Sequence, residues 1–223
     1  MDRRLFGRRK GRPLRPKRQN LLDTLLHDLT IDVKEVGLCK SFGRRLCVEI
    51  GFGSGEHLTW QAQNYPNSLF IGSEVYINGV SRLLSDISEK SIENIRLWID
   101  DGRLLLAALP NESVDLIYIL FPDPWPKTRH HKRRIIGPST VYEIERVLKP
   151  GGVLRTATDV PEYKIWMLQY ILNSGVFSWD ARRPFDWRKR PIDWPQTRYE
   201  IKALASKRNC TYFSFKKNTS KIF

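Results

Sequence analysis

Four acidic residues in this chain stand at the ends of four successive apolar stretches, and their spacing is the first sign of chemistry. They are Glu49, Glu74, Asp101 and Asp123. The carboxyl ends of parallel strands meet at one edge of a sheet, where open α/β proteins bind their ligands. Carboxylates accept hydrogen bonds and attract cations, so the set suits a ligand with hydroxyl, amino and ammonium groups. A helix N-cap or a solvated loop explains any one of these acids more simply, but four in this arrangement favour a binding site.

A glycine-rich turn follows the first apolar stretch, in the segment "VEIGFGSGEHL". Gly51, Gly53 and Gly55 alternate there, and glycine allows a sharp turn and a close approach of a ligand to the backbone. A dinucleotide fingerprint would need glycine in place of Glu56, and a P-loop would need a Gly-Lys-Ser/Thr run that the sequence lacks. The remaining pattern, E-x-G-x-G-x-G, resembles class I S-adenosylmethionine-dependent methyltransferases. A structural turn with incidental glycines is the alternative left open by this motif alone.

The resemblance to class I methyltransferases gives each acid an expected partner. Glu74 is placed to accept hydrogen bonds from a ribose diol, and Asp101 lies near an adenine amino group. Glu49 is expected near the methionyl ammonium, whose positive charge it would offset. Asp123 occupies the position that faces both the sulfonium methyl and the acceptor.

The fourth apolar stretch runs into an unusual segment, "ILFPDPWPKTRHHKRRI". Prolines on both sides of Asp123 hold its backbone extended, so its side chain is aimed before a substrate arrives. Trp125 offers an aromatic face to a base or to the cofactor, with core packing as the alternative. The basic run from Lys127 to Arg134 suits the neutralisation of RNA phosphates.

Five segments together resemble the tRNA (guanine-N7-)-methyltransferase family, over roughly residues 40–217. They are "VEIGFGSG", "GSEV", "FPDPWPKTRHHKRRI", "ATD" and "TRYE", in this order. The resemblance implies S-adenosyl-L-methionine as cofactor, tRNA as partner, and methyl transfer to N7 of the guanine at position 46 in the variable loop. It implies that the four strand-end acids and the glycine turn bind the cofactor, and that Asp123 is catalytic.

The same resemblance implies two further groups of residues. Contacts to the substrate nucleotide fall on Lys127, Asp159, Thr197, Arg198, Tyr199 and Glu200. Contacts to RNA fall on Arg129, His130, His131, Lys132, Arg133 and Arg134. Two departures from the family pattern are Ser73, where an apolar residue is expected, and Tyr76, where His or Arg is common. Neither is expected to touch the acids, so the expected activity stands.

The chemistry fits the residues without the family name. Guanine N7 carries a free lone pair and needs no deprotonation, so an in-line displacement requires mainly that two reactants be positioned. This accounts for the lack of an obvious nucleophile or Ser-His-Asp set. The product base is cationic, and carboxylates such as Asp123, Asp159 and Glu200 would stabilise the developing charge. The sequence does not rank Asp159 and Glu200 as the group that holds the guanine edge.

Net charge points to the class of partner. The 223 residues carry a formal net charge of +14, which favours nucleic acid or another polyanion over a small molecule. Two alternatives to the tRNA enzyme remain: a methyltransferase acting on another RNA such as rRNA, and a non-catalytic RNA-binding protein on the same fold. Monomer and homodimer are both open.

Other classes of protein are not indicated. Cys39, Cys47 and Cys210 are widely spaced, as is typical of reduced thiols in a cytoplasmic protein, and without a CxxC pair no metal site is expected. The basic N-terminus has no apolar core after it, so it does not read as a signal peptide. No apolar run approaches the roughly 18 residues of a membrane span.

Two more basic regions flank the expected site. Residues 1–18 are expected to form a basic flexible N-terminal arm, either a nucleic-acid arm or a solvated tail, and residues 19–223 a single domain that opens with a helix over 19–29. A second basic cluster consists of Arg182, Arg183, Arg188, Lys189 and Arg190. Trp187 and Trp194 interleave with it, either to meet unstacked bases or to anchor a solvated loop in the core.

Strand-like and helix-like stretches alternate along the chain. Strands are expected at 44–51, 68–75, 94–101, 113–121, 152–159 and 210–217. Helices are expected at 56–65, 77–88, 102–109, 139–148 and 162–174. The alternation predicts an α/β protein with helices on both faces of a mostly parallel sheet. With the family resemblance, the expected fold is the Rossmann-like class I methyltransferase with a seven-stranded sheet.

Overall fold

The computed structural model of the chain describes residues 6–32 and 43–219. Residues 1–5 of the expected arm, and Cys39, lie outside the described residues. The contacts divide the chain into two compact units, Met1–Ala108 and Leu109–Phe223. Each unit positions its own set of candidate functional residues.

Three parallel strands form the sheet of the first unit: β1 (Arg45–Ile50), β2 (Ser68–Ser73) and β3 (Ile95–Trp98). They lie in the order β3-β2-β1, and Glu49 pairs with Gly72, which in turn pairs with Leu97. Because the three strands are parallel, their carboxyl ends share one edge. The acids expected at the ends of these strands therefore lie along the same edge.

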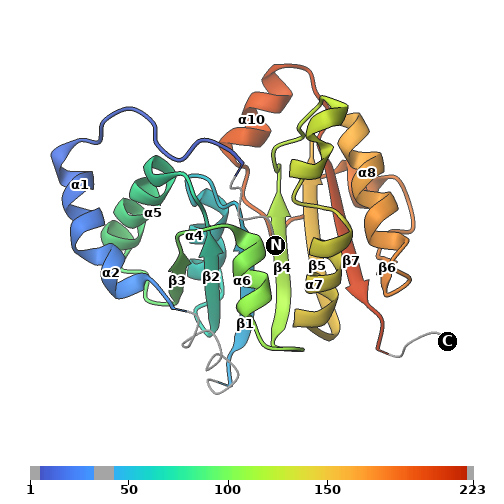
Figure 1. The fold of residues 1–223 in the computed structure, drawn as a ribbon, viewed down its shortest axis with the longest axis horizontal. Coiled ribbons are helices and arrows are strands. Elements are labelled where there is room, and N and C mark those ends of the chain that lie inside the picture. Colours follow the sequence, from blue (N-terminus) through green and yellow to red (C-terminus); the bar gives the residue numbers. More distant parts are fainter. Residues whose placement is uncertain (1–5, 33–42, 220–223) are drawn as a thin grey trace. The chain divides into compact units, whose positions relative to one another are not determined.

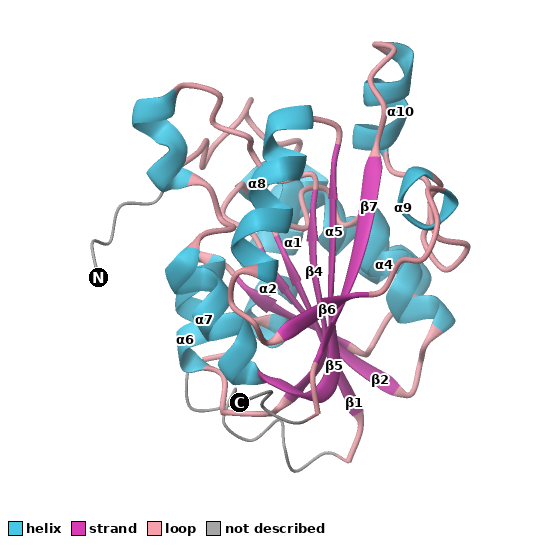
Figure 2. Cartoon of the chain, turned by 90° about the vertical axis from the view of Figure 1, so that its right-hand side faces the viewer, coloured by secondary structure: helices cyan, strands magenta, loops and turns pink. Residues whose placement is uncertain are grey.

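The helices of the first unit are α1 (Pro16–Asp23), α2 (Leu25–Leu29), α4 (Glu56–Asn64), α5 (Ile77–Lys90) and α6 (Gly102–Ala108). Helices α4 and α6 lie on opposite faces of the strands (Figures 1 and 2). Helix α5 buries Val80, Leu83, Leu84 and Ile87, which is the i, i+3, i+4, i+7 pattern of an amphipathic helix. The opposite face of α5 carries polar residues.

Helix α1 begins at Pro16, inside the segment expected to be an arm, and it packs beside α5 (Figure 1). Proline suits the first turn of a helix, where its missing N–H has no intrahelical partner. The expected helix over 19–29 is also split, because Thr24 has φ −117° and ψ −80° between α1 and α2.

Four strands belong to the second unit: β4 (Val114–Leu120), β5 (Leu148–Thr158), β6 (Phe177–Trp179) and β7 (Thr211–Lys217). Strand β5 is parallel to β4 and antiparallel to β7, and β6 pairs with β7 at the edge (Figure 2). Thr158 pairs with Thr211, so the start of β7 lies beside the end of β5. The sequence did not single out β6, whose three residues are too few to show a period.

The second unit also holds α7 (Pro138–Val147), α8 (Pro161–Leu172), α9 (Phe185–Arg188), α10 (Arg198–Ala205) and the 3₁₀ turn η2 (Thr128–Arg133). Helices α7 and α8 pack on β5, whereas α9 packs on β7 from the other face (Figure 2). The described residues hold seven strands, among which β7 runs antiparallel to its neighbours β5 and β6, and helices lie on both faces, so the predicted fold class is confirmed.

Candidate functional site

The glycine turn between β1 and α4 has the left-handed backbone that its sequence predicts. The φ angle is +75° at Gly51, +58° at Gly53 and +79° at Gly55, a region that side chains rarely adopt. A Cβ on Gly55 would lie 2.6 Å from Leu83 Cδ1, whereas a Cβ on Gly51 would meet nothing within 4 Å. Gly55 is therefore needed for packing, and Gly51 leaves open space against the backbone.

Glu74 ties this turn to the start of α5. Its Oε2 accepts a hydrogen bond from the Gly53 N–H at 2.8 Å. Its Oε1 accepts from the N–H groups of Val75 at 2.8 Å and Tyr76 at 2.9 Å. Backbone donors therefore fix the orientation of the carboxylate that the sequence assigns to a ribose diol.

Glu49 lies almost entirely inside the first unit, at 4% exposure. Its Oε2 is 2.7 Å from Nδ1 of the buried His57, in the first turn of α4. The other ring nitrogen of His57 lies 3.2 Å from Gln61 Nε2. Sequence reasoning missed His57, although its place in the glycine-turn motif, eight residues after Glu49, was the available signal.

Asp101 caps the N-terminus of α6, which is the role that the sequence analysis gave as the simpler explanation of a single acid at a strand end. Its Oδ1 accepts from the Arg103 N–H at 2.9 Å, and its Oδ2 pairs with the Arg103 guanidinium at 3.2 Å. The structure also explains the departure at Ser73, whose buried hydroxyl donates to the Asp100 carbonyl at 2.9 Å. Ser73 thus ties the end of β2 to the loop that carries Asp101.

The residues of the first unit fit S-adenosyl-L-methionine. Three carboxylates line one strand edge, and this cofactor carries an ammonium, a sulfonium and a ribose diol that such groups recognise. The positive φ and open space at Gly51 give the ligand access to the backbone beside them. Glu49, Glu74 and Asp101 are all present where the motif places them, at the ends of β1, β2 and β3.

Asp123 follows β4 in the second unit and is exposed. Two residues with left-handed backbone bracket it, Phe121 with φ +48° and Trp125 with φ +42°. Such conformations are costly for side-chain-bearing residues and persist only where the surroundings hold them, most often at functional sites. Together with the flanking prolines, they aim the Asp123 side chain outward.

Arg134 holds this loop from inside and differs from the rest of the basic run. It is 3% exposed, its Nε donates to the Pro124 carbonyl at 2.8 Å, and its guanidinium pairs with Glu162 of α8 at 2.8 Å. The guanidinium also stacks near the rings of Tyr163 and Trp166, at 5.0 and 4.5 Å. The expected RNA contact at Arg134 does not fit this burial, and its position assigns it to holding the loop.

The remaining basic residues form η2 and its flank, termed here the basic turn: Lys127, Arg129, His130, His131, Lys132 and Arg133. Lys127, Arg129 and Lys132 are exposed. Arg133 lies over the Trp125 ring at 4.9 Å, and His131 is 3.3 Å from Glu162. Desolvation, and then the neighbouring charges, beginning with Arg133, lower the pKa of His130. His130 therefore adds little positive charge at neutral pH, whereas the exposed Lys and Arg carry it.

Asp159 and Glu200 occupy a second cluster in the same unit. Asp159 pairs with Arg208 at 2.9 Å, and the buried Glu200 pairs with Arg190 at 3.1 Å. Burial, then the charges of Glu200 and Asp159, raise the pKa of the Cys210 thiol. The structure thus brings together two acids that are far apart in sequence, and the cationic partners Arg208 and Arg190 were not anticipated.

Tyr212 completes this cluster. Burial, followed by a hydrogen bond to Glu200, raises the pKa of its hydroxyl, so Tyr212 stays protonated and donates to the carboxylate. Thr197 is the N-cap of helix α10, and its Oγ1 accepts a hydrogen bond from the Glu200 N–H at 3.3 Å. Arg198 and Tyr199 are exposed, with Tyr199 at 62%. In the "TRYE" segment, the side chains of Arg198 and Tyr199 are therefore exposed, whereas that of Glu200 is buried.

The tryptophans of the second basic cluster anchor it to the fold. Trp194 is buried against Tyr118 and Tyr212, with ring centroids 6.0 and 5.6 Å apart. Trp187 packs on Trp179 at 5.0 Å. Of the two readings of this segment, the packing favours a loop with tryptophan anchors.

The described part of the chain holds neither a candidate metal centre nor a candidate membrane-spanning helix. No group of three or more His, Cys, Asp or Glu there is arranged to hold a metal ion. None of the helices in residues 6–32 and 43–219 has the length and apolarity that crossing a membrane would need.

Comparison with known proteins identifies the family. The family model Methyltransf_4, "Putative methyltransferase", matches residues 43–212. The tRNA (guanine-N(7)-)-methyltransferase of Rhodospirillum rubrum is 45% identical over 97% of this chain and 88% of its own length. The enzyme of the same name from Agrobacterium fabrum is 42% identical over 94% of this chain and 93% of its own.

A solved structure extends the comparison to the fold. It is a 16S rRNA (adenine(1408)-N(1))-methyltransferase from Catenulisporales acidiphilia with its cosubstrate SAM, at a TM-score of 0.54 and 16% identity, covering 84% of this chain and 92% of that one. At this identity the similarity bears on the fold alone. The relatives at 40% identity and above decide the family: the chain belongs to the tRNA (guanine-N(7)-)-methyltransferase family.

Proposed function

We propose that the chain transfers a methyl group from S-adenosyl-L-methionine to N7 of a guanine in tRNA, at position 46 of the variable loop, and that it does so in the cytoplasm. The observation that carries the proposal is the exposed Asp123, held by prolines and left-handed residues beside a turn of exposed cations. The names of the relatives at 40–45% identity supply the substrate class.

The first unit binds the cofactor. Gly51, Gly53 and Gly55 let it lie against the backbone, and Glu49, Glu74 and Asp101 receive its ammonium, diol and adenine groups. When bound, the cofactor supplies an electrophilic methyl group on a sulfonium. The fixed orientation of Glu74 means that no side-chain ordering is needed at the moment of binding.

The second unit binds and orients the nucleotide. Asp123 stabilises the positive charge that develops on the guanine as N7 attacks, and Asp159 or Glu200 accepts hydrogen bonds from the N1–H and amino edge. Lys127, with Thr197, Arg198 and Tyr199, contacts the nucleotide. Residues Arg129 to Arg133 of the basic turn contact the phosphates, and Arg129 and Lys132 are the exposed cations among them.

A transcript assay tests the proposal. Unmodified tRNA is incubated with labelled S-adenosylmethionine, digested, and the labelled nucleoside identified. Label should appear in 7-methylguanosine, and it should vanish from a transcript made with 7-deazaguanosine, which lacks the N7 atom but keeps the base-pairing edge. Label in another nucleoside, or in rRNA but not tRNA, would reject the tRNA guanine-N7 assignment.

Position 46 is tested by a second transcript in which only that guanine is replaced by adenine. Methylation should fall to background because no N7 guanine acceptor remains at the proposed site. Retained 7-methylguanosine would move the acceptor to another guanine while leaving the reaction type intact.

A further inference from the structure

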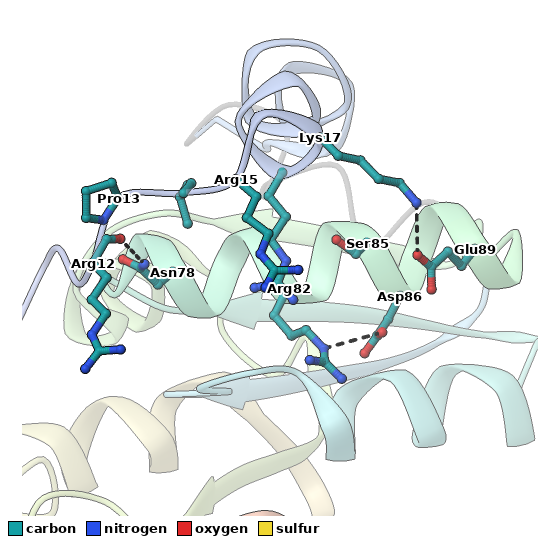
Figure 3. A pocket seen from close by; sticks show the side chains of 11 residues that line it. Arg12, Pro13, Arg15, Lys17, Asn78, Arg82, Ser85, Asp86 and Glu89 are labelled. Atoms are coloured by element: carbon teal, nitrogen blue, oxygen red, sulfur yellow. Dashed lines mark hydrogen bonds and ion pairs between the residues drawn. The ribbon is translucent and has the colours of Figure 1, made fainter.

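A cavity of about 620 Å³ lies in the first unit between the N-terminal segment and α5 (Figure 3). Arg12, Arg15, Lys17 and Arg18 line it from the N-terminal side, and Arg82 lines it from α5. Two acids, Asp86 and Glu89, complete the charged lining. This arm cavity is separate from the acids and glycines assigned to the cofactor.

The N-terminal segment is held against α5 by specific contacts. Arg9 O accepts from the Ile77 N–H at 3.0 Å. Asn78 makes two hydrogen bonds, accepting from the Gly11 N–H and donating to Arg12 O, each at 2.7 Å. A Cβ on Gly11 would meet the Tyr76 hydroxyl and the Asn78 side chain, so any larger residue there would make these side chains shift. These contacts hold the segment in a defined position on α5, which a solvated tail would not have.

The charges around the arm cavity do not balance. Asp86 pairs with Arg82 at 3.8 Å, and Glu89 pairs with Lys17 at 3.4 Å. Among the described residues, no acid pairs with Arg12, Arg15 or Arg18. Figure 3 shows Arg15 extending from the arm toward α5, on which Arg82 lies. The lining thus carries three arginines, Arg12, Arg15 and Arg18, that its two acids do not pair.

We propose that the arm cavity binds backbone phosphate of the RNA substrate, as a second anchoring point in addition to the basic turn; this rests on the proposed function. Arginine matches phosphate because its planar donors form paired hydrogen bonds with the oxygens. The lining contains no aromatic side chain on which a base could stack, and Pro13 and Leu14 are its apolar members. Backbone phosphate is thus the part of RNA that this lining recognises.

The test compares two double variants that remove equal charge from the first unit. Arg12→Ala/Arg15→Ala removes two unpaired cavity arginines, whereas Arg44→Ala/Arg45→Ala removes two exposed arginines at the amino end of β1, outside the cavity. The dissociation constant of unmodified tRNA is measured across a range of salt concentrations. Each lost phosphate contact should reduce the slope of log K against log salt by about 0.7 to 0.9.

The cavity variant should lose about 10-fold or more in tRNA affinity with a slope reduced by about one to two, and the control should lose less than half as much slope. Equal changes in both variants would overturn the proposal, because they would report net charge alone. Cofactor affinity should stay within about two-fold of the parent in both variants, since neither pair belongs to the cofactor residues.

Asn78→Ala tests the docked arm itself, because it keeps every charge and removes both clasping hydrogen bonds. Its tRNA affinity should fall about three-fold or more, and unchanged affinity would overturn the requirement for a docked arm. These binding measurements need no methyl transfer. If the variants show the expected changes in salt slope but the parent protein transfers no methyl group to tRNA, the proposed reaction fails while the phosphate site stands.

Discussion

Burying a carboxylate as deeply as Glu49 costs free energy unless a hydrogen-bond donor or a cation compensates it. His57 is that group, at 2.7 Å, and both side chains are nearly inaccessible to water. We predict that His57→Ala lowers the free energy of unfolding by about 3 kcal/mol, since it leaves a buried charge without its partner. It should also weaken cofactor binding, because Glu49 loses the contact that orients it.

Urea denaturation of His57→Ala, with cofactor titration on the folded variant, provides the measurement. His27→Ala is the matched control, because His27 is exposed and its ring lies 3.6 Å from the carboxylate of the exposed Asp28. It should change the free energy of unfolding by less than about 0.5 kcal/mol. Similar effects of the two substitutions would mean that the Glu49–His57 contact contributes nothing special.

Asp123 is the opposite case, an exposed acid whose loss leaves the core intact. Asp123→Asn should reduce the rate of methyl transfer by about 100-fold or more, because the neutral amide no longer stabilises the cationic base. Affinity for tRNA and the unfolding midpoint should stay close to those of the parent. Single-turnover assays with saturating tRNA give the rate.

Glu112→Gln is the control for Asp123→Asn, since Glu112 is an exposed acid of the same unit, 3.9 Å from Lys217. It should leave the rate unchanged. An Asp123→Asn enzyme with the parental rate would remove Asp123 from the mechanism.

At the scale of single residues, the sequence predicts the acids but not their partners. A strand end and a glycine turn are local patterns, so Glu49, Glu74 and Asp123 stand out from the chain alone. His57 and Arg208 were missed, and Arg190 was assigned to a basic cluster without its partner Glu200, because each role is recognised only through a contact made by folding. The same holds for Arg134, whose place in a basic run predicts exposure although its side chain is buried.

Among the elements, the loop after β4 depends on α8 through Arg134. The guanidinium bonds Pro124 O and Glu162 at once, which a lysine ammonium on a flexible stem cannot reproduce in both directions. We predict that Arg134→Lys lowers the unfolding free energy by about 2 kcal/mol and lowers kcat at saturating tRNA, because the loop that aims Asp123 is loosened. The salt slope of tRNA binding should not change.

Arg129→Ala separates this positioning role from RNA contact. Arg129 is exposed on the basic turn, so its loss should weaken tRNA binding and reduce the salt slope by about 0.7 to 0.9 while leaving kcat unchanged. If Arg134→Lys instead changed the slope and left kcat alone, Arg134 would belong to the RNA face.

The elements themselves were largely readable from sequence. Buried parallel strands give continuous apolar runs, and β4 is an example with a mostly buried Val114–Leu120. The features that were not readable include the short strand β6, the helices α9 and α10, the break between α1 and α2, and the start of α1 at Pro16. Each depends on tertiary contacts, since a three-residue strand or a docked arm has no period of its own.

Across the whole molecule, a net charge of +14 predicts a polyanionic partner but not where it binds. In the structure, basic residues gather at the arm cavity of the first unit and at the basic turn of the second unit. Because the two sets lie in different units and share no ion-pair partner among the described residues, their contributions to RNA binding should be independent.

Combining Arg12→Ala/Arg15→Ala with Arg129→Ala/Lys132→Ala tests this independence. If each surface contacts different phosphates of one RNA at the same time, the losses in log affinity and in salt slope should add, within about 0.5 kcal/mol. Salt titrations of the parent, the two doubles and the quadruple variant supply the four values. A quadruple variant no weaker than either double would mean that the surfaces bind one after the other, so that only one holds the RNA in the complex measured.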